Sequence, residues 1–164
     1  MRTLQKLVAG ATIFFSLVLF TPIVWAEEEL PYDLMTCGSG TTTMISSSEE
    51  LTVFFAESKG ITISNPRGGW ADNSTYHCGG VTRVSKEKVF YLFYCKFIDA
   101  DGDVIVGETV GEGPEGKWTY LQGTGKYKGI TGGGKNWDVA SGKPITPGTS
   151  QGCRRAVGTY KIPK

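Results

Sequence analysis

The sequence lacks an excess of charge of either sign and has almost no histidine. Its 164 residues include 17 Lys and Arg, 16 Asp and Glu, and one His. Proteins that bind nucleic acids or anionic membrane surfaces usually have a large basic excess, so we expect neither partner. A single His, without a cluster of His and Cys, also argues against a His-rich metal site. The sequence therefore predicts no metal site and no cofactor.

Helical periodicity is also lacking. Apolar side chains do not recur every 3.6 positions or so over any long stretch, as a helix would require. Short runs with period two, rich in Val, Ile, Thr and aromatic residues, alternate instead with Gly, Asn, Asp and Pro. This pattern predicts an all-β protein. The expected strands lie at about 40–47, 50–57, 60–64, 74–84, 88–98, 104–110, 117–122, 126–131, 135–140 and 153–162.

Long apolar runs are absent after residue 26. Residues 1–26 combine an early basic region, an uncharged run from Leu7 to Trp25, and Ala26 before an acidic stretch. This order predicts a secretory signal peptide cleaved after Ala26. The alternative is an uncleaved anchor, because the run is nearly long enough to span a bilayer. We expect one exported domain over 27–164, periplasmic or secreted, with no membrane association after cleavage; its oligomeric state stays open.

All four cysteines lie in the part expected to be exported, where an oxidising compartment favours two disulfides over free buried thiols. A two-residue turn at Lys86-Glu87 would place Cys78 opposite Cys95, in a non-hydrogen-bonded pair where side chains approach closely. Cys37 and Cys153 then pair by elimination. Their pairing would join the first strand region to the last, as a closed antiparallel barrel of about eight strands requires.

The same register separates the two faces of the expected hairpin. One face carries no charge and is expected to point inward; its members are Tyr76, Cys78, Gly80, Thr82, Val84, Val89, Tyr91, Phe93, Cys95 and Phe97. A two-residue turn at Asp101-Gly102 extends this face into the next strand, where it would place Val106 opposite Phe97 and Glu108 opposite Cys95. A buried carboxylate is costly unless it has a partner, and a shift of one residue would turn Glu108 outward.

The most specific string in the chain is GTGKYKGITGGG, over residues 123–134. It resembles the G-T-G-x-[FY]-x-G-[IA]-x-G segment of small secreted barrels of the allene oxide cyclase/dirigent-like class, within the calycin-like barrels. The hairpin at 99–103 and Trp118 are also similar to that class, and the resemblance spans roughly residues 90–140. It implies an eight-stranded antiparallel barrel, often with an apolar cavity. No catalytic residue of the class finds a match outside the motif, and the disulfides depart from the class. The glycines are expected to turn a barrel corner; direct ligand contact is the alternative.

Several other motifs are expected to be structural. The segment 129–136 approaches a phosphate-binding loop, but Asn136 replaces the required Ser or Thr and no helix follows. The acidic segment 99–103 approaches a calcium loop, but Val110 stands where an EF-hand needs Glu, so a hairpin turn is favoured.

Asn73 begins a glycosylation sequon that matters only in a eukaryotic secretory pathway. We interpret His77, Arg154, Arg155, Lys126 and Lys128 as ordinary surface side chains of strands.

We weigh three functions. The first is a binding module for a small apolar or amphipathic ligand inside the barrel, with Glu108 as polar anchor and walls made of Tyr76, Tyr91, Phe93, Phe97, Trp118 and Tyr120. In the second, these residues fill the core, and a structural or interaction protein acts through its outer face or the loop at 144–148. The third is a cyclase or isomerase that positions its substrate and uses Glu108 as acid or base. No catalytic residue is assigned.

Overall fold

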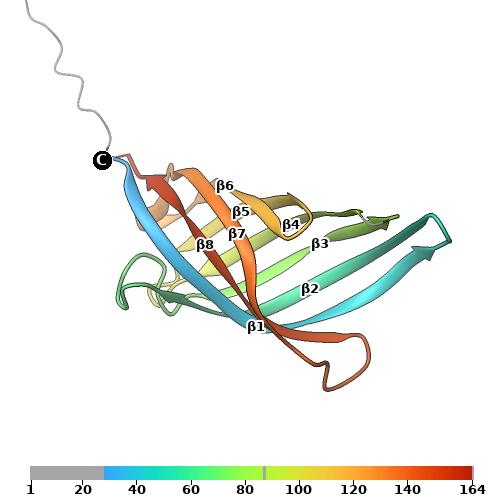
Figure 1. The fold of residues 1–164 in the computed structure, drawn as a ribbon. Helices are drawn as coiled ribbons and strands as arrows, with labels where there is room; N and C mark the ends of the chain where they lie inside the picture. The colour runs from blue at the N-terminus through green and yellow to red at the C-terminus, as the bar shows by residue number, and fades with distance from the viewer. Residues whose placement is uncertain (1–27, 87, 164) are drawn as a thin grey trace, which may run out of the picture.

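The computed structural model describes residues 28–86 and 88–163, which form one closed antiparallel barrel (Figure 1). Each strand pairs with its neighbours in sequence, and the first strand pairs with the last. The strands are β1 (Leu30–Ser47), β2 (Leu51–Ser64), β3 (Thr75–Ser85), β4 (Lys88–Ile98), β5 (Val104–Glu112), β6 (Glu115–Gly123), β7 (Thr131–Gly142) and β8 (Thr149–Lys161). The predicted all-β barrel is confirmed. The predicted signal peptide, residues 1–26, lies outside the described residues.

Several of the expected strand bounds are wrong. The first strand begins at Leu30 and not at about residue 40. The segments 50–57 and 60–64 form one strand, β2, because Gly60 lies opposite Gly38 within the ladder and does not turn the chain. A Cβ atom at Gly60 would collide with the backbone carbonyl of Cys37, so the glycine permits close strand pairing. The expected strand at 126–131 is replaced by a short 3-10 helix over Gly125–Tyr127 and the connection that follows it.

Both predicted disulfides are present, and the β3–β4 register is the expected one. Cys78 faces Cys95 and Cys37 faces Cys153, with Cα–Cα distances of 4.0 and 4.1 Å. Cys78 and Cys95 are buried inside the barrel, whereas Cys37 and Cys153 are partly exposed. The second bond links β1 to β8 and so fastens the seam at which the barrel closes.

The predicted β4–β5 register is wrong by one residue. Ile105 lies opposite Phe97, and Glu108 lies opposite Tyr94 instead of Cys95. The reason is the carboxylate of Asp99, which accepts hydrogen bonds from the backbone N–H groups of Asp101 and Asp103, both at 2.9 Å. The backbone N–H of Asp99 also donates to the carbonyl of Asp103, so that three residues, 100–102, form the tip of the loop in place of the expected two. The alternation of β5 is therefore reversed: Ile105, Gly107 and Thr109 are buried, and Val104, Val106, Glu108 and Val110 face outward.

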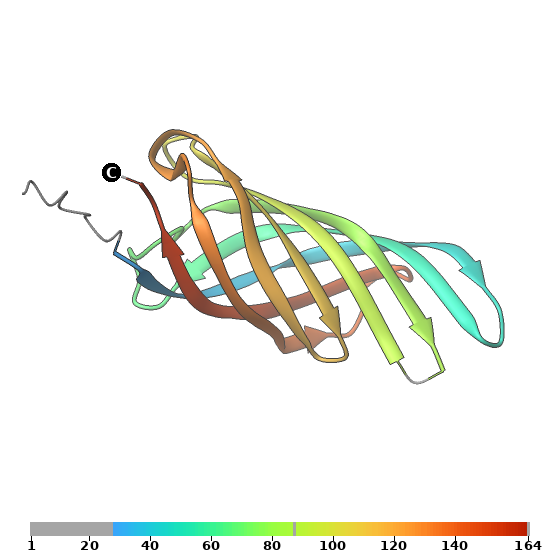
Figure 2. The ribbon, with the colours of Figure 1, turned by 90° about the horizontal axis from the view of Figure 1, so that it is seen from above.

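The two ends of the barrel differ. At one end, the loop between β2 and β3 packs Trp70 against Tyr127 and Tyr160, with ring centroids 6.2 and 4.9 Å apart. At the other end the β1–β2 hairpin projects well beyond the β5–β6 hairpin (Figure 2). Aromatic side chains thus plug the barrel at the first of these ends. None of the helices in the described part of the chain has the length and apolarity needed to cross a bilayer.

Candidate ligand cavity

A cavity of about 330 Å³ lies inside the barrel. Its walls include five of the six aromatic residues expected there, namely Tyr76, Phe93, Phe97, Trp118 and Tyr120. They belong to β3, β4 and β6, and strand alternation turns them inward. Four of the rings form a continuous series, with centroids 6.0 Å apart for Tyr76 and Phe97, 5.6 Å apart for Phe97 and Trp118, and 5.7 Å apart for Trp118 and Tyr120. The structure therefore brings five of these six side chains together around one cavity.

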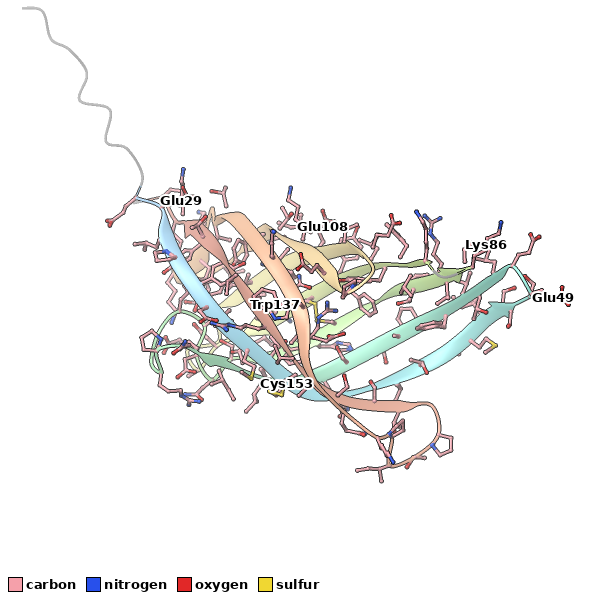
Figure 3. All side chains as sticks on the ribbon, in the orientation of Figure 1. Glu29, Glu49, Lys86, Glu108, Trp137 and Cys153 are labelled. Carbon is pink, nitrogen blue, oxygen red and sulfur yellow. A yellow bond between two sulfur atoms is a disulfide. The ribbon has the colours of Figure 1, made fainter. Side chains whose placement is uncertain are left out.

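Glu108 and Tyr91, also expected in the wall, do not line the cavity. Glu108 lies on the outer face of β5, because the Asp99 loop shifts the register (Figure 3). The prediction that it anchors a ligand from inside is therefore wrong. Tyr91 is buried and points inward, but its hydroxyl is occupied by a hydrogen bond from Nη2 of Arg154 at 3.0 Å.

The polar groups of the cavity come from residues that the sequence analysis missed. Asn136 on β7 is 6% exposed, and its Nδ2 donates to Oγ1 of Thr109 at 2.8 Å. Its Oδ1 has no hydrogen-bond partner within residues 28–86 and 88–163. The positions of Thr109 and Asn136 follow from the corrected register of β5 and from the pairing of Gly116 with Asn136.

Arg154 also lines the cavity, so its interpretation as an ordinary solvated charge is wrong. It lies opposite Thr36 of β1, on the same face as the buried Leu34. Its Nε is 3.1 Å from Oδ1 of Asp138, and its side chain is only 33% exposed. No local signal in the sequence reveals this face, since the neighbouring Cys153 also borders the cavity.

The plugged end of the cavity contains a cluster of three aromatic rings. The centroids of Tyr32, Trp70 and Tyr120 lie 5.4 to 5.9 Å from one another. Burial raises the pKa of Tyr32 to about 12, an effect that the nearby Tyr120 hydroxyl partly offsets. Burial also raises the pKa of Tyr120, and more strongly. Both hydroxyls therefore keep their protons at physiological pH.

The opposite end of the cavity reaches solvent. Its lining there includes the exposed residues Ser39, Glu57, Asp138, Ser141 and Ser150. They belong to β1, β2, β7 and β8. A small molecule could therefore reach the aromatic interior from this end.

The acidic segment and the glycine string contribute to structure outside the cavity lining. Nζ of Lys126 lies 2.6 Å from carboxylate oxygens of both Asp99 and Asp101, so a protein ammonium occupies the place of a bound cation. Burial raises the pKa of the Asp99 carboxyl. Hydrogen bonds from Lys126 and Tyr127 outweigh this effect and hold the pKa below its usual value. The glycines form the corner between β6 and β7, where Gly125 and Gly129 have positive φ. Within the described ranges, no group of three or more His, Cys, Asp and Glu is arranged to hold a metal ion.

Comparisons with known proteins give a fold but no close relative. No protein-family model matches the chain, and no curated protein matches it. The chain is similar to the solved structure of the pterocarpan synthase dirigent protein GePTS1, with 11% identity, a TM-score of 0.52, and coverage of 86% of this chain and 96% of that one. A second solved structure, of the pterocarpan synthase dirigent protein PsPTS1, matches with 12% identity and a TM-score of 0.47 over 85% of this chain and 99% of that one. With its closed eight-stranded antiparallel barrel, the chain has the fold of the dirigent-like class of β-barrels.

Proposed function

We propose that the protein is exported and binds one small, largely apolar ligand inside its barrel. The observation that carries this proposal is the cavity of about 330 Å³ with aromatic walls and an opening to solvent. Ligand sites are typically mostly apolar cavities of about 300–1,000 Å³ with a few well-placed polar groups. Asn136, Thr109 and Arg154 are such groups here.

Two features support the export part of the proposal. The leader pattern of residues 1–26 is typical of a secretory signal peptide. The disulfides Cys37–Cys153 and Cys78–Cys95 are bonds that form and persist in oxidising compartments. Fractionation of the producing cell tests this part: the processed chain should appear outside the cytoplasm, beginning at Glu27.

Ligand binding is tested by native mass spectrometry and thermal shift with a panel of lipids and aromatic metabolites. We expect a one-to-one adduct and a raised melting temperature with at least one compound class, because a ligand that binds only the folded state stabilises it. Ala56→Phe, which projects a ring into the cavity, should weaken binding at least tenfold. Ala100→Phe, at the exposed tip of the β4–β5 loop, is the matched control and should bind normally.

The opposite outcome would favour the filled-core alternative. If no compound stabilises the protein, and Ala56→Phe raises the melting temperature by filling empty space, the interior is a packing defect and not a site. The cyclase or isomerase hypothesis assigned the acid or base to Glu108. This residue lies on the outer face of β5 and cannot reach a substrate inside the barrel.

A further inference from the structure

The plugged end of the cavity gathers three polar atoms that have no hydrogen-bond partner in the described part of the chain. They are the indole Nε1 of Trp70 and the hydroxyls of Tyr32 and Tyr120. The three residues come from the β2–β3 loop, β1 and β6, and their rings are in mutual contact. Tyr32 and Tyr120 are only 7% and 6% exposed, so water outside the barrel does not satisfy them.

All three groups can donate a hydrogen bond. An indole N–H can only donate a hydrogen bond, and a phenol that keeps its proton is a donor as well as an acceptor. Burial holds the protons on both tyrosines, because it raises the pKa of each hydroxyl. The cluster therefore holds three groups that can donate, from three separate elements, at the closed end of the cavity. The two hydroxyls lie close enough for one to donate to the other, which still leaves one hydroxyl and the indole N–H as donors for a ligand.

Leaving such groups unpaired carries a stability cost. A buried polar group without a partner destabilises a fold, whereas an apolar group of the same shape does not. Phe at positions 32 and 120 would fill nearly the same space without that cost. The hydroxyls are thus better explained by a molecule that accepts their hydrogen bonds than by the packing of the barrel.

The middle of the cavity offers a hydrogen-bond acceptor, in contrast to the donors at the closed end. Oδ1 of Asn136 is a buried acceptor without a partner. The hydroxyl of Tyr32 lies against Gly134, 2.7 Å from where a Cβ atom would stand. Gly134 and Asn136 are two residues apart on β7, a step of roughly 7 Å along a strand. A ligand would thus meet donors at the closed end and an acceptor about one ring length nearer the mouth.

We infer that the closed end selects a carbonyl oxygen, so that the ligand is a flat, largely apolar ketone or related carbonyl compound inserted with its oxygen among Tyr32, Trp70 and Tyr120. The ring body of such a compound packs against the wall formed by Phe97 and Trp118, which lines the cavity beside the cluster. This inference rests on the proposed function, because it assigns the class of ligand for the same cavity. It requires no covalent step.

The test compares two probes of nearly the same shape by isothermal titration calorimetry. The first is 2-acetylnaphthalene, and the second is 2-isopropenylnaphthalene, in which a methylene group replaces the carbonyl oxygen. We expect the ketone to bind at least tenfold more tightly, because only the ketone pairs with buried donors. Tyr120→Phe and Tyr32→Phe should each reduce that ratio toward one, and both should raise the melting temperature of the free protein.

Tyr94→Phe is the matched control, since Tyr94 is 51% exposed on the outer face of β4. It should leave both the preference and the melting temperature unchanged. Equal binding of the two probes to the unaltered protein would overturn the inference and leave the binding function standing, as would be the case if the donors merely hold an ordered water. Failure of both probes to bind would overturn the inference and weigh against the cavity proposal itself. A preference that survives in both tyrosine variants would place the carbonyl elsewhere and also overturn the inference.

Discussion

At the scale of single residues, Arg154 and Glu108 exchange the roles that their sequence context predicts. The carboxylate expected inside lies on the surface of β5, and the guanidinium expected on the surface lines the cavity. In both cases the outcome depends on strand parity, because a shift of one position reverses the face on which a side chain lies. Arg154 matters further because it supplies the hydrogen bond to the buried hydroxyl of Tyr91.

Replacing Arg154 should therefore destabilise the barrel. Arg154→Met removes the donor and leaves the Tyr91 hydroxyl buried without a partner, at a cost of about 1–3 kcal/mol in the free energy of unfolding. Lys96→Met, an equally apolar change at an exposed position of β4, should alter that free energy by less than about 0.5 kcal/mol. Urea denaturation of the two variants measures the difference. Equal losses would show that the Arg154–Tyr91 contact contributes nothing.

At the scale of the strand, adjacent glycines in β3 have different functions. A Cβ atom at Gly80 would overlap the carbonyl of Leu92 and the backbone of Phe93 across the ladder. At Gly79 the nearest atom is the ring carbon Cζ of Phe55 at 3.4 Å, which is ordinary contact. Gly80 is therefore required by close pairing inside the barrel, whereas Gly79 is not.

This difference predicts opposite effects of the same substitution. Gly80→Ala should destabilise the protein by about 1–3 kcal/mol or more through overpacking. Gly79→Ala should be neutral or stabilising by up to about 1 kcal/mol, because alanine loses less backbone entropy on folding. Thermal unfolding of both variants tests the prediction, and a greater loss in Gly79→Ala than in Gly80→Ala would contradict it.

The hairpin loops are the elements most sensitive to acid. Hydrogen bonds from Gly68 and Ser64 hold the pKa of Asp72 below its usual value, and those from Lys126 and Tyr127 do so for Asp99. A carboxyl group with a lower pKa in the folded state contributes stability above its unfolded pKa of about 4, and that stability is lost as the pH falls through the folded pKa. The urea midpoint should therefore fall on acidification below about pH 4.

Asp99→Asn isolates the contribution of one loop. The variant should be less stable than the unaltered protein at pH 7 and should lose less stability between neutral and acidic pH. Glu49→Gln, at the exposed tip of the β1–β2 hairpin, is the control and should follow the unaltered protein at every pH. Identical pH profiles for Asp99→Asn and the unaltered protein would refute the assignment.

At the scale of the whole molecule, the two disulfides differ in what they constrain. Cys37–Cys153 joins residues 116 positions apart and fastens the barrel seam, whereas Cys78–Cys95 closes a segment of 17 positions within one hairpin. A cross-link limits the unfolded chain more when it closes a longer loop. The seam bond should therefore stabilise the barrel more than the hairpin bond does.

Double substitution to alanine tests this order. Loss of the seam bond should cost about 4–5 kcal/mol and loss of the hairpin bond about 3 kcal/mol, in the chain-entropy account of disulfides. Because Cys78 and Cys95 are buried, their removal also leaves a small void, which works against the expected order. A seam variant as stable as the unaltered protein would show that the β1–β8 ladder alone closes the barrel.

The parts of the fold that could be predicted are those with a strong local signal. The β3–β4 hairpin follows from a short turn, an uncharged face and a pair of cysteines in register. The part of the cavity wall that lies on this hairpin could therefore be predicted as well; it consists of Tyr76, Phe93 and Phe97.

The polar part of the site could not be predicted in the same way. The register of β5 depends on side-chain hydrogen bonds of Asp99, which the Asp-Gly turn signal does not reveal. The glycines at 132–134 carry no alternating pattern, and the β7–β8 ladder shifts register between Asp138 and Ala140. The faces of Asn136 and Arg154 were therefore hidden until the strands were paired.

The tryptophans of the barrel lie in two different environments, and this difference affects their fluorescence. Trp70 and Trp118 line the cavity, whereas Trp137 lies next to the inward-facing Asn136 and so on the outer face, with the guanidinium of Arg155 5.9 Å from its ring centre. Fluorescence from the first two should change when a molecule fills the interior, and that from Trp137 should not. In Trp137→Phe the emission of the described part of the chain would come from the cavity alone. The intrinsic tryptophan fluorescence of the protein should therefore report whether its interior is empty or occupied.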